Sequence, residues 1–280
     1  MTPGERRISL AHLTVIDAGP IQLIEAAVAG GFDAIGLRIV APTASDTIVP
    51  VIGVEPMLRE IERRLADNAL SILDIEAIWL APHTDARTFG AIVETGARLG
   101  ARFVLAIGND PEPARQRDNF ARLAESARAV GLRAVMEFIP YCQVATLAQA
   151  RALVRDAAVP GAAVVVDALH LVRSGGSIAD LAGLTPDDVP YLQLCDARAT
   201  PPPTDGLRAE ARGDRLYPGD GALDVHGLLR TLPASLPISV EAPCAAYAHL
   251  PATERARLCG ERTRRVLAQA LPDRERLARS

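Results

Sequence analysis

Four apolar segments in the second half of the chain each carry, near the carboxyl end, a side chain with oxygen donors. These side chains are Glu137 in VMEF, Asp167 in VVVDALH, Gln193 in YLQLCD and Glu241 in SVEAP. An acid buried without a partner in an apolar strand is costly, so four such groups that converge require a cation. Three carboxylates and one carboxamide suit a hard divalent ion better than zinc, which cysteine and histidine favour. The residues therefore predict one divalent ion, with Mn²⁺ or Mg²⁺ preferred and Co²⁺ as a further candidate, unless each acid merely pairs with a nearby arginine.

The segments that would position these groups follow one repeated pattern. A short apolar segment, a polar or glycine- and proline-containing break, and an amphipathic segment rich in Ala, Leu and Arg recur eight times. Alternation of strand with helix is typical of a parallel sheet, and eight units predict a single closed (β/α)₈ TIM barrel over residues 1–280, with flexible termini at about 1–6 and 272–280. The expected strands are 8–13, 34–39, 71–75, 103–107, 134–138, 163–167, 191–195 and 238–241. The expected helices are 20–29, 55–67, 86–99, 113–130, 147–156, 225–232 and 252–270, with 171–184 a short helix at most.

The barrel brings the four oxygen donors to one end. They lie on the fifth to eighth expected strands, separated by 30, 26 and 48 residues, so consecutive strands direct them toward one axis. Active sites of such barrels lie at the carboxyl ends of the strands. Two long connections, 40–54 and 196–221, follow the second and seventh strands on that face. Connections of this length are more often functional than accidental, so both are candidate lids, with tolerated surface insertions as the alternative.

Further motifs connect these residues to a known family. The chain has a DxxH spacing at Asp167 and His170, a QxxD spacing at Gln193 and Asp196, and the stretch RLYPGDGALD at 215–224. Together with the four oxygen donors, these motifs resemble the sugar isomerase/epimerase superfamily, whose members are xylose isomerase-like TIM barrels related to family 2 AP endonucleases. The resemblance covers nearly the whole chain. It implies a barrel enzyme that depends on a divalent metal.

The resemblance also implies roles for individual residues. His170 and Arg215 match positions that contact substrate oxygens. In the epimerases the two glutamate ligands exchange protons with carbons on opposite faces of the substrate, which implies catalytic roles for Glu137 and Glu241. His170, which contacts substrate oxygens, is also expected to be catalytic. A cation polarises the C=O of an α-hydroxy carbonyl compound and stabilises an enediolate while a carboxylate removes the α-proton, and an arginine can fork onto a carboxylate or vicinal oxygens. The implied metal ligands are Glu137, Asp167, Gln193 and Glu241.

The chain departs from the sugar epimerases at two positions. Many of those enzymes have histidine where Gln193 stands, and a second glutamate six positions after the first, where this chain has Gln143. A glutamine at the third ligand position instead resembles the 3-dehydroshikimate dehydratases of the same superfamily, which use a similar metal site for an elimination. Proton abstraction beside a polarised carbonyl is common to both reactions, so it is the part of the inference that survives.

Three residues at the ends of the first three expected strands face the same mouth. His12 would hydrogen-bond a substrate hydroxyl there, with a structural histidine as the alternative. Arg38 and Glu76 would bind an acidic substrate or pair with each other across the mouth. The expected substrate-binding residues are therefore Arg215, His12, Arg38 and Glu76.

Composition excludes several classes of protein. The 280 residues contain no lysine, since all 30 basic residues are arginine, which excludes Schiff-base aldolases, PLP enzymes and P-loop NTPases. With 34 acidic residues, a net charge of −4 and arginines interspersed among the acids, no nucleic-acid partner is expected. The four cysteines form no CxxC pair, which is typical of a reducing compartment. The sequence shows no signal peptide and no segment near the ~18 apolar residues of a membrane span. These features predict a cytoplasmic protein without a membrane partner.

The leading hypothesis is a divalent-metal-dependent isomerase or epimerase that acts on a small polyhydroxylated carbonyl compound, a sugar or sugar-like molecule, through an enediolate. The alternative enzyme is a lyase of the 3-dehydroshikimate dehydratase type, in which proton abstraction is followed by loss of a β-hydroxyl. A non-catalytic barrel that binds a ligand is the alternative from a different class. The expected partner is a small-molecule substrate, and assembly into a homo-oligomer stays open.

Overall fold

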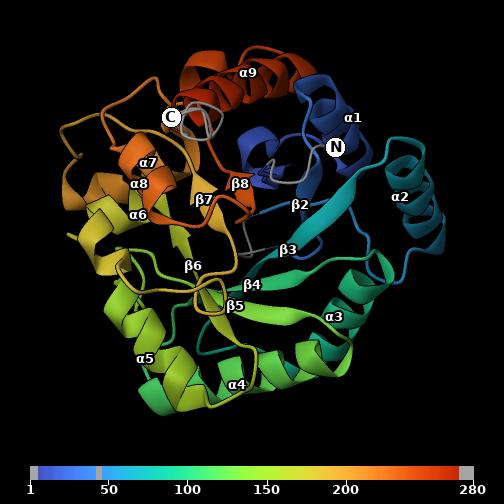
Figure 1. Ribbon diagram of the computed structural model, residues 1–280. Coiled ribbons are helices and arrows are strands. Elements are labelled where there is room, and N and C mark those ends of the chain that lie inside the picture. The colour runs from blue at the N-terminus through green and yellow to red at the C-terminus, as the bar shows by residue number, and fades with distance from the viewer. Residues whose placement is uncertain (1–5, 42–45, 271–280) are drawn as a thin grey trace, which may run out of the picture.

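The computed structural model describes residues 6–41 and 46–270. Eight parallel strands close into a barrel in chain order, with the first strand paired to both the second and the eighth (Figure 1). This confirms the expected (β/α)₈ barrel. The strands are β1 Ile8–Leu10, β2 Ala34–Arg38, β3 Ser71–Leu80, β4 Phe103–Gly108, β5 Arg133–Glu137, β6 Ala163–Asp167, β7 Leu192–Leu194 and β8 Ile238–Val240.

Helices surround the barrel and cover the outer faces of the strands (Figure 1). They are α1 Pro20–Gly30, α2 Glu55–Asp67, α3 Phe89–Arg98, α4 Pro113–Ala129, α5 Leu147–Ala157, α6 Ala168–Arg173, α7 Leu207–Gly213, α8 Val225–Thr231 and α9 Ala252–Ala270. The last of them, α9, packs against both α1 and α8 and so closes the outer ring. Among the residues that the structure describes, none of these helices combines the length and the apolar character that a membrane crossing requires.

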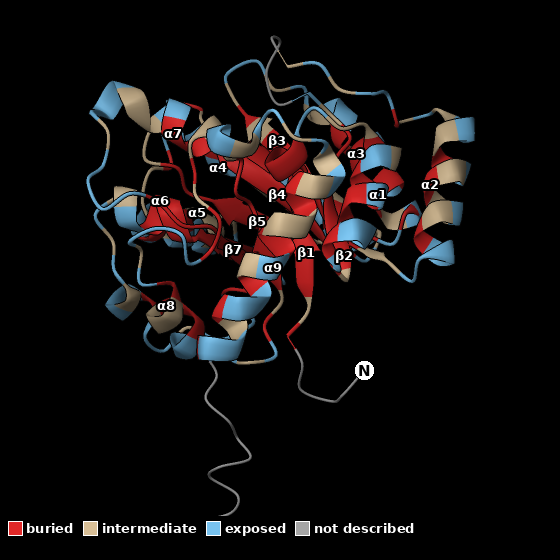
Figure 2. Ribbon diagram, turned by 90° about the horizontal axis from the view of Figure 1, so that it is seen from above, coloured by how far each residue is buried: buried red, intermediate tan, exposed pale blue. Residues whose placement is uncertain are grey.

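Alternate side chains of the strands form two buried layers. Phe103, Leu105 and Val165 belong to a cluster that fills the inside of the barrel. Val164 and Val166, the neighbours of Val165, belong instead to the cluster that packs under the helices. Strands buried on both faces read as continuous apolar runs, which is why β6 was visible in the sequence. Figure 2 shows the strands almost wholly buried and the helices exposed on their outer sides.

Two strands, β1 and β3, differ from their expected bounds by more than one residue. Residues His12–Val15 form a 3₁₀ helix after β1, so His12 is not a strand residue. The third strand continues to Leu80 instead of ending at 75, so Glu76 lies within β3 and not at its end. The acidic side chains inside SILDIEAIWL interrupt the apolar run, and for that reason the sequence pattern ended the strand too early.

Two short helices on the strand-end face were not visible as separate elements in the sequence. Directly after β6, α6 begins because Asp167 Oδ1 accepts the backbone N–H of His170 at 2.9 Å and caps the helix. The short helix expected within 171–184 is the end of α6 followed by a 3₁₀ helix at Ile178–Leu181. The expected loop 196–221 contains α7. Helices of six and seven residues are too short to reveal a 3.6-residue period.

Arg6 stands at the end of the amino-terminal segment that was expected to be flexible, and it packs against the body of the protein. This side chain is buried, and its Nη2 donates to the carbonyl oxygens of Leu232 at 3.2 Å and Pro233 at 2.7 Å. It thereby ties the residues before β1 to the chain after α8. The other residues of the expected flexible termini, and part of the first candidate lid, lie outside the described residues, which exclude 1–5, 42–45 and 271–280.

Candidate active site

A cavity opens at the carboxyl ends of the strands, where the site was expected. Most of the expected catalytic and substrate-binding side chains line it, and His12 is absent from its wall. The lining side chains include Leu13, Arg38, Glu76, Trp79, Leu105, Ile107, Glu137, Tyr141, His170, Ala211, Arg212, Arg215 and Glu241.

Alternate strands contribute alternate layers of inward side chains in such a barrel. Among the inward polar side chains are Glu76, Glu137 and Gln193 from β3, β5 and β7, and Arg38, Asp167 and Glu241 from β2, β6 and the residue after β8. Because β2 and β6 are four strands apart in a ring of eight, Arg38 and Asp167 lie on opposite sides of the barrel. Within the site, Glu137 and Asp167 at β5 and β6 make up what we call the carboxylate-rich side, and Arg38, with Glu76 beside it, stands on the facing side.

Three of the expected residues form a compact group on the carboxylate-rich side. One ligand atom from each of Glu137, Asp167 and His170 lies within 4.8 Å of the others. His170 Nε2 is 3.7 Å from Glu137 Oε1. The helix cap at Asp167 explains the DxxH spacing, because it holds His170 in the first turn of α6, beside the carboxylate that precedes it. His170 was expected to contact substrate, and the structure also places it among the candidate ligands.

Gln193 is the clearest sign that this group needs a further binding partner. Its side chain is fully buried, and neither its Oε1 nor its Nε2 has a hydrogen-bond partner. Burial, reinforced by the charges of Glu241 and Asp167, raises the pKa of Glu137 well above its ordinary value. Unsatisfied buried donors of this kind are rare and commonly mark an ion or water site. The oxygen atoms of Glu137, Asp167 and Gln193 thus fit a hard divalent ion, and the imidazole of His170 extends the set toward transition metals.

Arg215 is already committed to the protein. Its Nη1 donates to Asp167 Oδ2 at 2.6 Å, its Nη2 to Glu241 Oε2 at 3.0 Å and its Nε to the carbonyl oxygen of Ala211 at 2.8 Å. Burial raises the pKa of Glu241 to about 7 even though Arg215 lowers it. The pKa of Asp167 falls, because Arg215 and His170 outweigh the effect of burial. Arg215 therefore bridges Glu241 and Asp167. The alternative that each oxygen donor pairs with an arginine is met for these two of the four.

The RLYPGDGALD stretch owes its pattern to Asp196. The backbone groups of Asp196 and Leu216 exchange hydrogen bonds of 2.9 and 2.8 Å, next to Arg215. The Asp196 carboxylate also accepts the N–H of Gly219 at 3.0 Å. Gly219 has a φ of +86°, and a Cβ at Gly221 would lie 2.3 Å from Asp196 Oδ1, so the turn requires glycine at both positions. The QxxD and PGxG motifs are thus one unit that positions Arg215.

His12 has a structural role and not the substrate contact that was expected. Its Nδ1 accepts the backbone N–H of Arg38 at 3.1 Å, and its Nε2 donates to the carbonyl oxygen of Ala18 at 2.8 Å. Its own backbone N–H donates to Glu76 Oε1 at 2.7 Å. Burial lowers the pKa of His12 to about 4, so the ring is neutral and both nitrogens are used. These contacts favour the alternative of a structural histidine.

Arg38 and Glu76 do not form the ion pair that their positions suggested. Their Cα atoms are direct partners between β2 and β3, yet no ion pair joins them among the described residues. Burial and the charge of Asp74 raise the pKa of Glu76 to about 7, although Arg38 and the backbone N–H of His12 lower it. The carboxylate of Glu76 is held by the His12 N–H, which leaves the Arg38 guanidinium facing the cavity.

The two candidate lids meet over this cavity. In α7, Arg212 pairs with Asp46 of the first connection at 2.6 Å, and Arg208 lies over the ring of Trp79 at 5.8 Å. Tyr141 packs edge-on against His170 at 6.0 Å. The sequence did not predict a role for Arg208 or Arg212 of α7. The only signal that could have suggested a contact between the two connections is their opposite charges, Asp46 on the first and Arg212 on the second.

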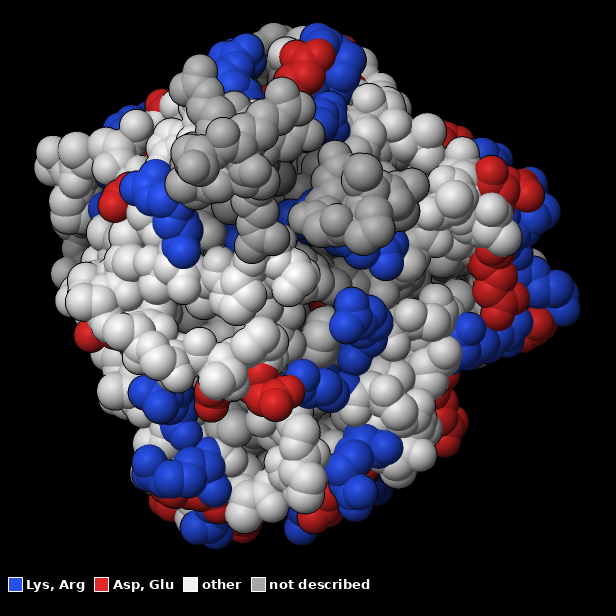
Figure 3. Space-filling model, in the orientation of Figure 1, with Lys and Arg blue, Asp and Glu red and all other residues white. Residues whose placement is uncertain are grey.

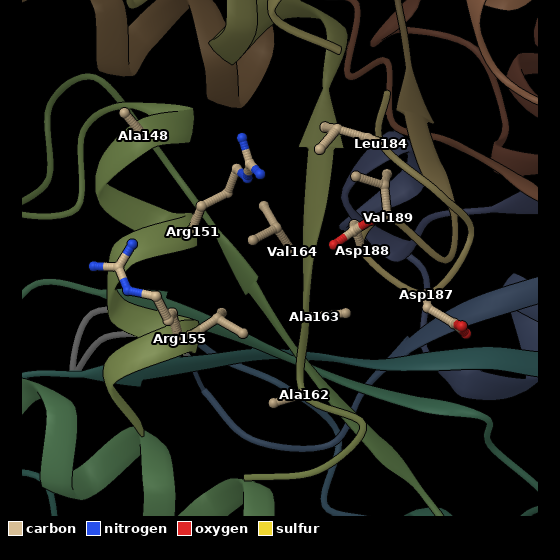
Figure 4. Close-up of a pocket in the computed structure, with 11 residues that line it drawn as sticks. Ala148, Arg151, Arg155, Ala162, Ala163, Val164, Leu184, Asp187, Asp188 and Val189 are labelled. Carbon is tan, nitrogen blue, oxygen red and sulfur yellow. The ribbon is translucent and has the colours of Figure 1, made fainter. Parts of the chain in front are cut away.

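A second hollow lies on the outside of the barrel, between α5 and the residues that precede β7. Figure 4 shows Arg151 on α5 pointing toward Leu184, whereas the guanidinium of Arg155 points away from it. It lies at the amino end of β6, away from the strand ends that carry the site. On the face seen in Figure 3, arginine and acidic side chains are interspersed.

Sequence comparison finds curated relatives among dehydratases and isomerases. The chain is 29% identical over 190 residues to the 3-dehydroshikimate dehydratase of Pseudomonas aeruginosa, an alignment that covers 63% of this chain and 30% of that protein. It is 28% identical over 194 residues to the inosose isomerase of Bacillus licheniformis, which covers 65% of this chain and 68% of that protein. Its similarity to the dehydratase thus spans about a third of that longer protein.

Solved structures share the fold over almost the full length. A crystal structure of IolI protein with a bound zinc atom superposes with a TM-score of 0.77 at 20% identity, covering 95% of this chain and 100% of that one. The probable 3-DHS dehydratase AsbF of Bacillus anthracis superposes with a TM-score of 0.73 at 11% identity, covering 95% and 100%. Residues 24–260 match the model of one protein family. The chain belongs to the family of xylose isomerase-like TIM barrels.

Proposed function

We propose that the protein is a divalent-metal-dependent isomerase or epimerase of a small polyhydroxylated carbonyl compound. The observation that carries the proposal is the buried group of Glu137, Asp167 and His170 beside the unpartnered amide of Gln193. Of these groups, Glu137 and His170 line the cavity at the strand ends, where a substrate can reach them. Relatives that are isomerases and dehydratases support an enzyme that works on sugar-like compounds.

The ion would be held by Glu137, Asp167, Gln193 and Glu241, with His170 within reach of the same position. The oxygen-rich donors favour Mn²⁺ or Mg²⁺ over softer metals, and Co²⁺ also accepts such a set. When bound, such an ion polarises a carbonyl group and offsets the negative charge that develops on its oxygen.

The residues of this chain supply the proton transfers. Glu137 is the proposed base that removes a proton from the carbon next to the carbonyl, because no described side chain donates a hydrogen bond to its carboxylate. Glu241, held by Arg215 at 3.0 Å, is the proposed partner that exchanges a proton from the other side of the substrate. Burial lowers the pKa of His170 to about 4, so its neutral ring can donate a hydrogen bond to a substrate oxygen.

The cavity wall protects this chemistry from water. Trp79 and Tyr141 line the cavity, and α7 lies over it through Arg208 and Arg212. An enediolate is a strong base that water would protonate, so an enzyme of this type needs such a cover.

A dehydratase of the 3-dehydroshikimate type is the second candidate. Gln193, in the third ligand position, favours it, as does the relative from Pseudomonas aeruginosa. Incubation of the metal-loaded protein with a panel of ketoses and inososes and with 3-dehydroshikimate in D₂O separates the two reactions. Deuterium at carbon without loss of water supports the isomerase, and absorbance of a new conjugated product supports the dehydratase.

Metal analysis tests the site itself. After reconstitution the wild-type chain should hold one divalent ion, while Glu137→Gln and Asp167→Asn should lose most of it, because each replaces a charged ligand by a neutral amide. Glu94→Gln, an exposed substitution on α3, is the matched control and should keep the ion. Less than one ion in the wild type, or unchanged content in both site variants, would rule the site out.

A further inference from the structure

We propose that Arg38 binds a carboxylate of the substrate, and that this carboxylate is remote from the reacting carbonyl group. The inference rests on the proposed function for the position of the carbonyl. It assigns the natural substrate to the hydroxylated carbonyl acids and not to the neutral sugars.

Arg38 is a buried cation that the protein leaves without a partner. Its side chain is 5% exposed and lines the cavity at the end of β2. Its Nε is buried without a hydrogen-bond partner, and no ion pair involves its guanidinium among the described residues. Burial of a guanidinium without a hydrogen-bond acceptor costs more free energy than the loss of an ordinary hydrogen bond. A ligand that supplies the acceptor removes this cost and therefore binds more tightly.

The acids around Arg38 are already used. Glu76 accepts the backbone N–H of His12, and Glu241 accepts from Arg215. Both acids lie close enough to feel the charge of Arg38, which lowers the pKa of each. Neither is joined to it by a hydrogen bond or ion pair, so the guanidinium fork remains open toward the cavity.

The other two arginines of the cavity are not open in this way. Arg215 spends its Nε and both terminal nitrogens on Ala211, Asp167 and Glu241. Arg212 pairs with Asp46 at 2.6 Å. The arginine that the sequence motif suggests for an anionic substrate group is therefore saturated, and Arg38 is the one that can take that role.

The shape of the group favours a carboxylate over a hydroxyl. A guanidinium offers two parallel N–H groups that match the two oxygens of a carboxylate, whereas a single hydroxyl satisfies only one of them. The backbone of Arg38 is fixed both by the sheet and by the bond to His12, so the fork projects from a rigid support. Rigid support of this kind lowers the entropy lost on binding.

The topology separates the two ends of the substrate. Arg38 stands on β2, whereas Glu137 and Asp167 stand on β5 and β6, on the far side of the barrel. A substrate whose carbonyl lies beside Glu137 would meet Arg38 with a group on its other side. Pyruvate, whose carboxylate is adjacent to its carbonyl, is therefore the short ligand against which such a substrate is compared.

Paired ligands on the metal-loaded full chain test the proposal. Calorimetry compares 3-dehydroshikimate, which carries its carboxylate away from its ketone, with its methyl ester, and compares both with pyruvate. The acid should bind about 10- to 100-fold more tightly than the ester, as expected for hydrogen bonds to a charged group, and pyruvate should bind weakly. Arg38→Met should reduce the ratio of acid to ester affinity to near one, and Arg38→Lys, which keeps the charge but not the fork, should give an intermediate ratio.

Two controls keep the outcome clear. Arg151→Met removes an arginine outside the barrel, in the hollow of Figure 4, and should leave the affinity ratio unchanged. Metal content should stay at the wild-type level in Arg38→Met. Absence of the ion from the wild type would mark failure of the proposed function and not of this inference. If no difference between acid and ester appears in the wild type, or if the ratio persists in a folded Arg38→Met variant, the assignment is overturned.

Discussion

His12 Nδ1 accepts the backbone N–H of Arg38 at 3.1 Å, and this bond joins the 3₁₀ helix after β1 to the end of β2. The neutral ring simultaneously donates to the carbonyl oxygen of Ala18. The sequence predicts that His12 faces the cavity. In the structure His12 does not line the cavity, and it instead holds the backbone of Arg38, which does.

Replacement of His12 by leucine should destabilise the protein by about 1–3 kcal/mol, because it leaves a buried N–H and a buried carbonyl without partners. The same change should weaken substrate binding by loosening Arg38. Urea unfolding monitored by circular dichroism measures the first effect. His83→Leu, at an exposed site, is the control and should change the free energy of unfolding by less than about 0.5 kcal/mol. Equal stability of the two variants would contradict the role assigned to His12.

Arg215 should matter most when no metal is bound. Arg215→Met leaves Asp167 and Glu241 buried without their cation, and removal of one partner from such a group costs about 3–5 kcal/mol. Addition of Mn²⁺ should stabilise this variant more than the wild type, because in the variant the ion is the positive charge that offsets the carboxylates of Asp167 and Glu241. Thermal unfolding with and without Mn²⁺ measures the difference. Arg198→Met, which breaks an exposed ion pair with Asp214, should show neither effect.

Asp74 should make the metal-free protein less stable as pH rises. Burial raises its pKa from 3.8 to about 7, although the Tyr191 hydroxyl, which donates to Asp74 at 2.6 Å, lowers it. The folded state then binds this proton more tightly than the unfolded chain, so its stabilising effect is complete below the ordinary pKa and is lost as pH rises to about 7. Asp74→Asn should gain stability relative to wild type at pH above about 7 and lose that advantage near pH 4.

Urea unfolding of both proteins across this range measures the pH dependence. Asp118→Asn on the exposed face of α4 is the control and should run parallel to the wild type. A difference between Asp74→Asn and wild type that does not vary with pH would contradict the raised pKa of Asp74.

Gly221 should tolerate no side chain. A Cβ there would lie 2.3 Å from Asp196 Oδ1 and 2.5 Å from the carbonyl oxygen of Ala197, so Gly221→Ala should cost about 1–3 kcal/mol and displace the segment that carries Arg215. Gly213→Ala meets no atom within 4 Å and serves as the control. The prediction fails if both alanine variants keep wild-type stability and wild-type metal affinity.

Local sequence patterns were enough to predict the barrel. Apolar strands followed by amphipathic helices report their own burial, and strand ends on one face follow from parallel pairing, so the common position of Glu137, Asp167, Gln193 and Glu241 could be read from the chain. The DxxH motif was equally local, because a helix cap involves residues three positions apart. The predicted third strand was too short, because Asp74 and Glu76 interrupt the apolar pattern by which a buried strand is recognised.

The sequence by itself therefore determined the fold and the set of polar residues at one end of it, because both depend on periodicity within short segments. Tertiary structure alone decided how those residues share their partners. Arg215 saturates itself on Asp167, 48 positions away, and Glu241, 26 positions away, while Arg38 remains unpaired beside the strand partner that it was expected to bind. Such choices depend on side-chain distances across the barrel, and a pattern of residue types along the chain carries no information about them.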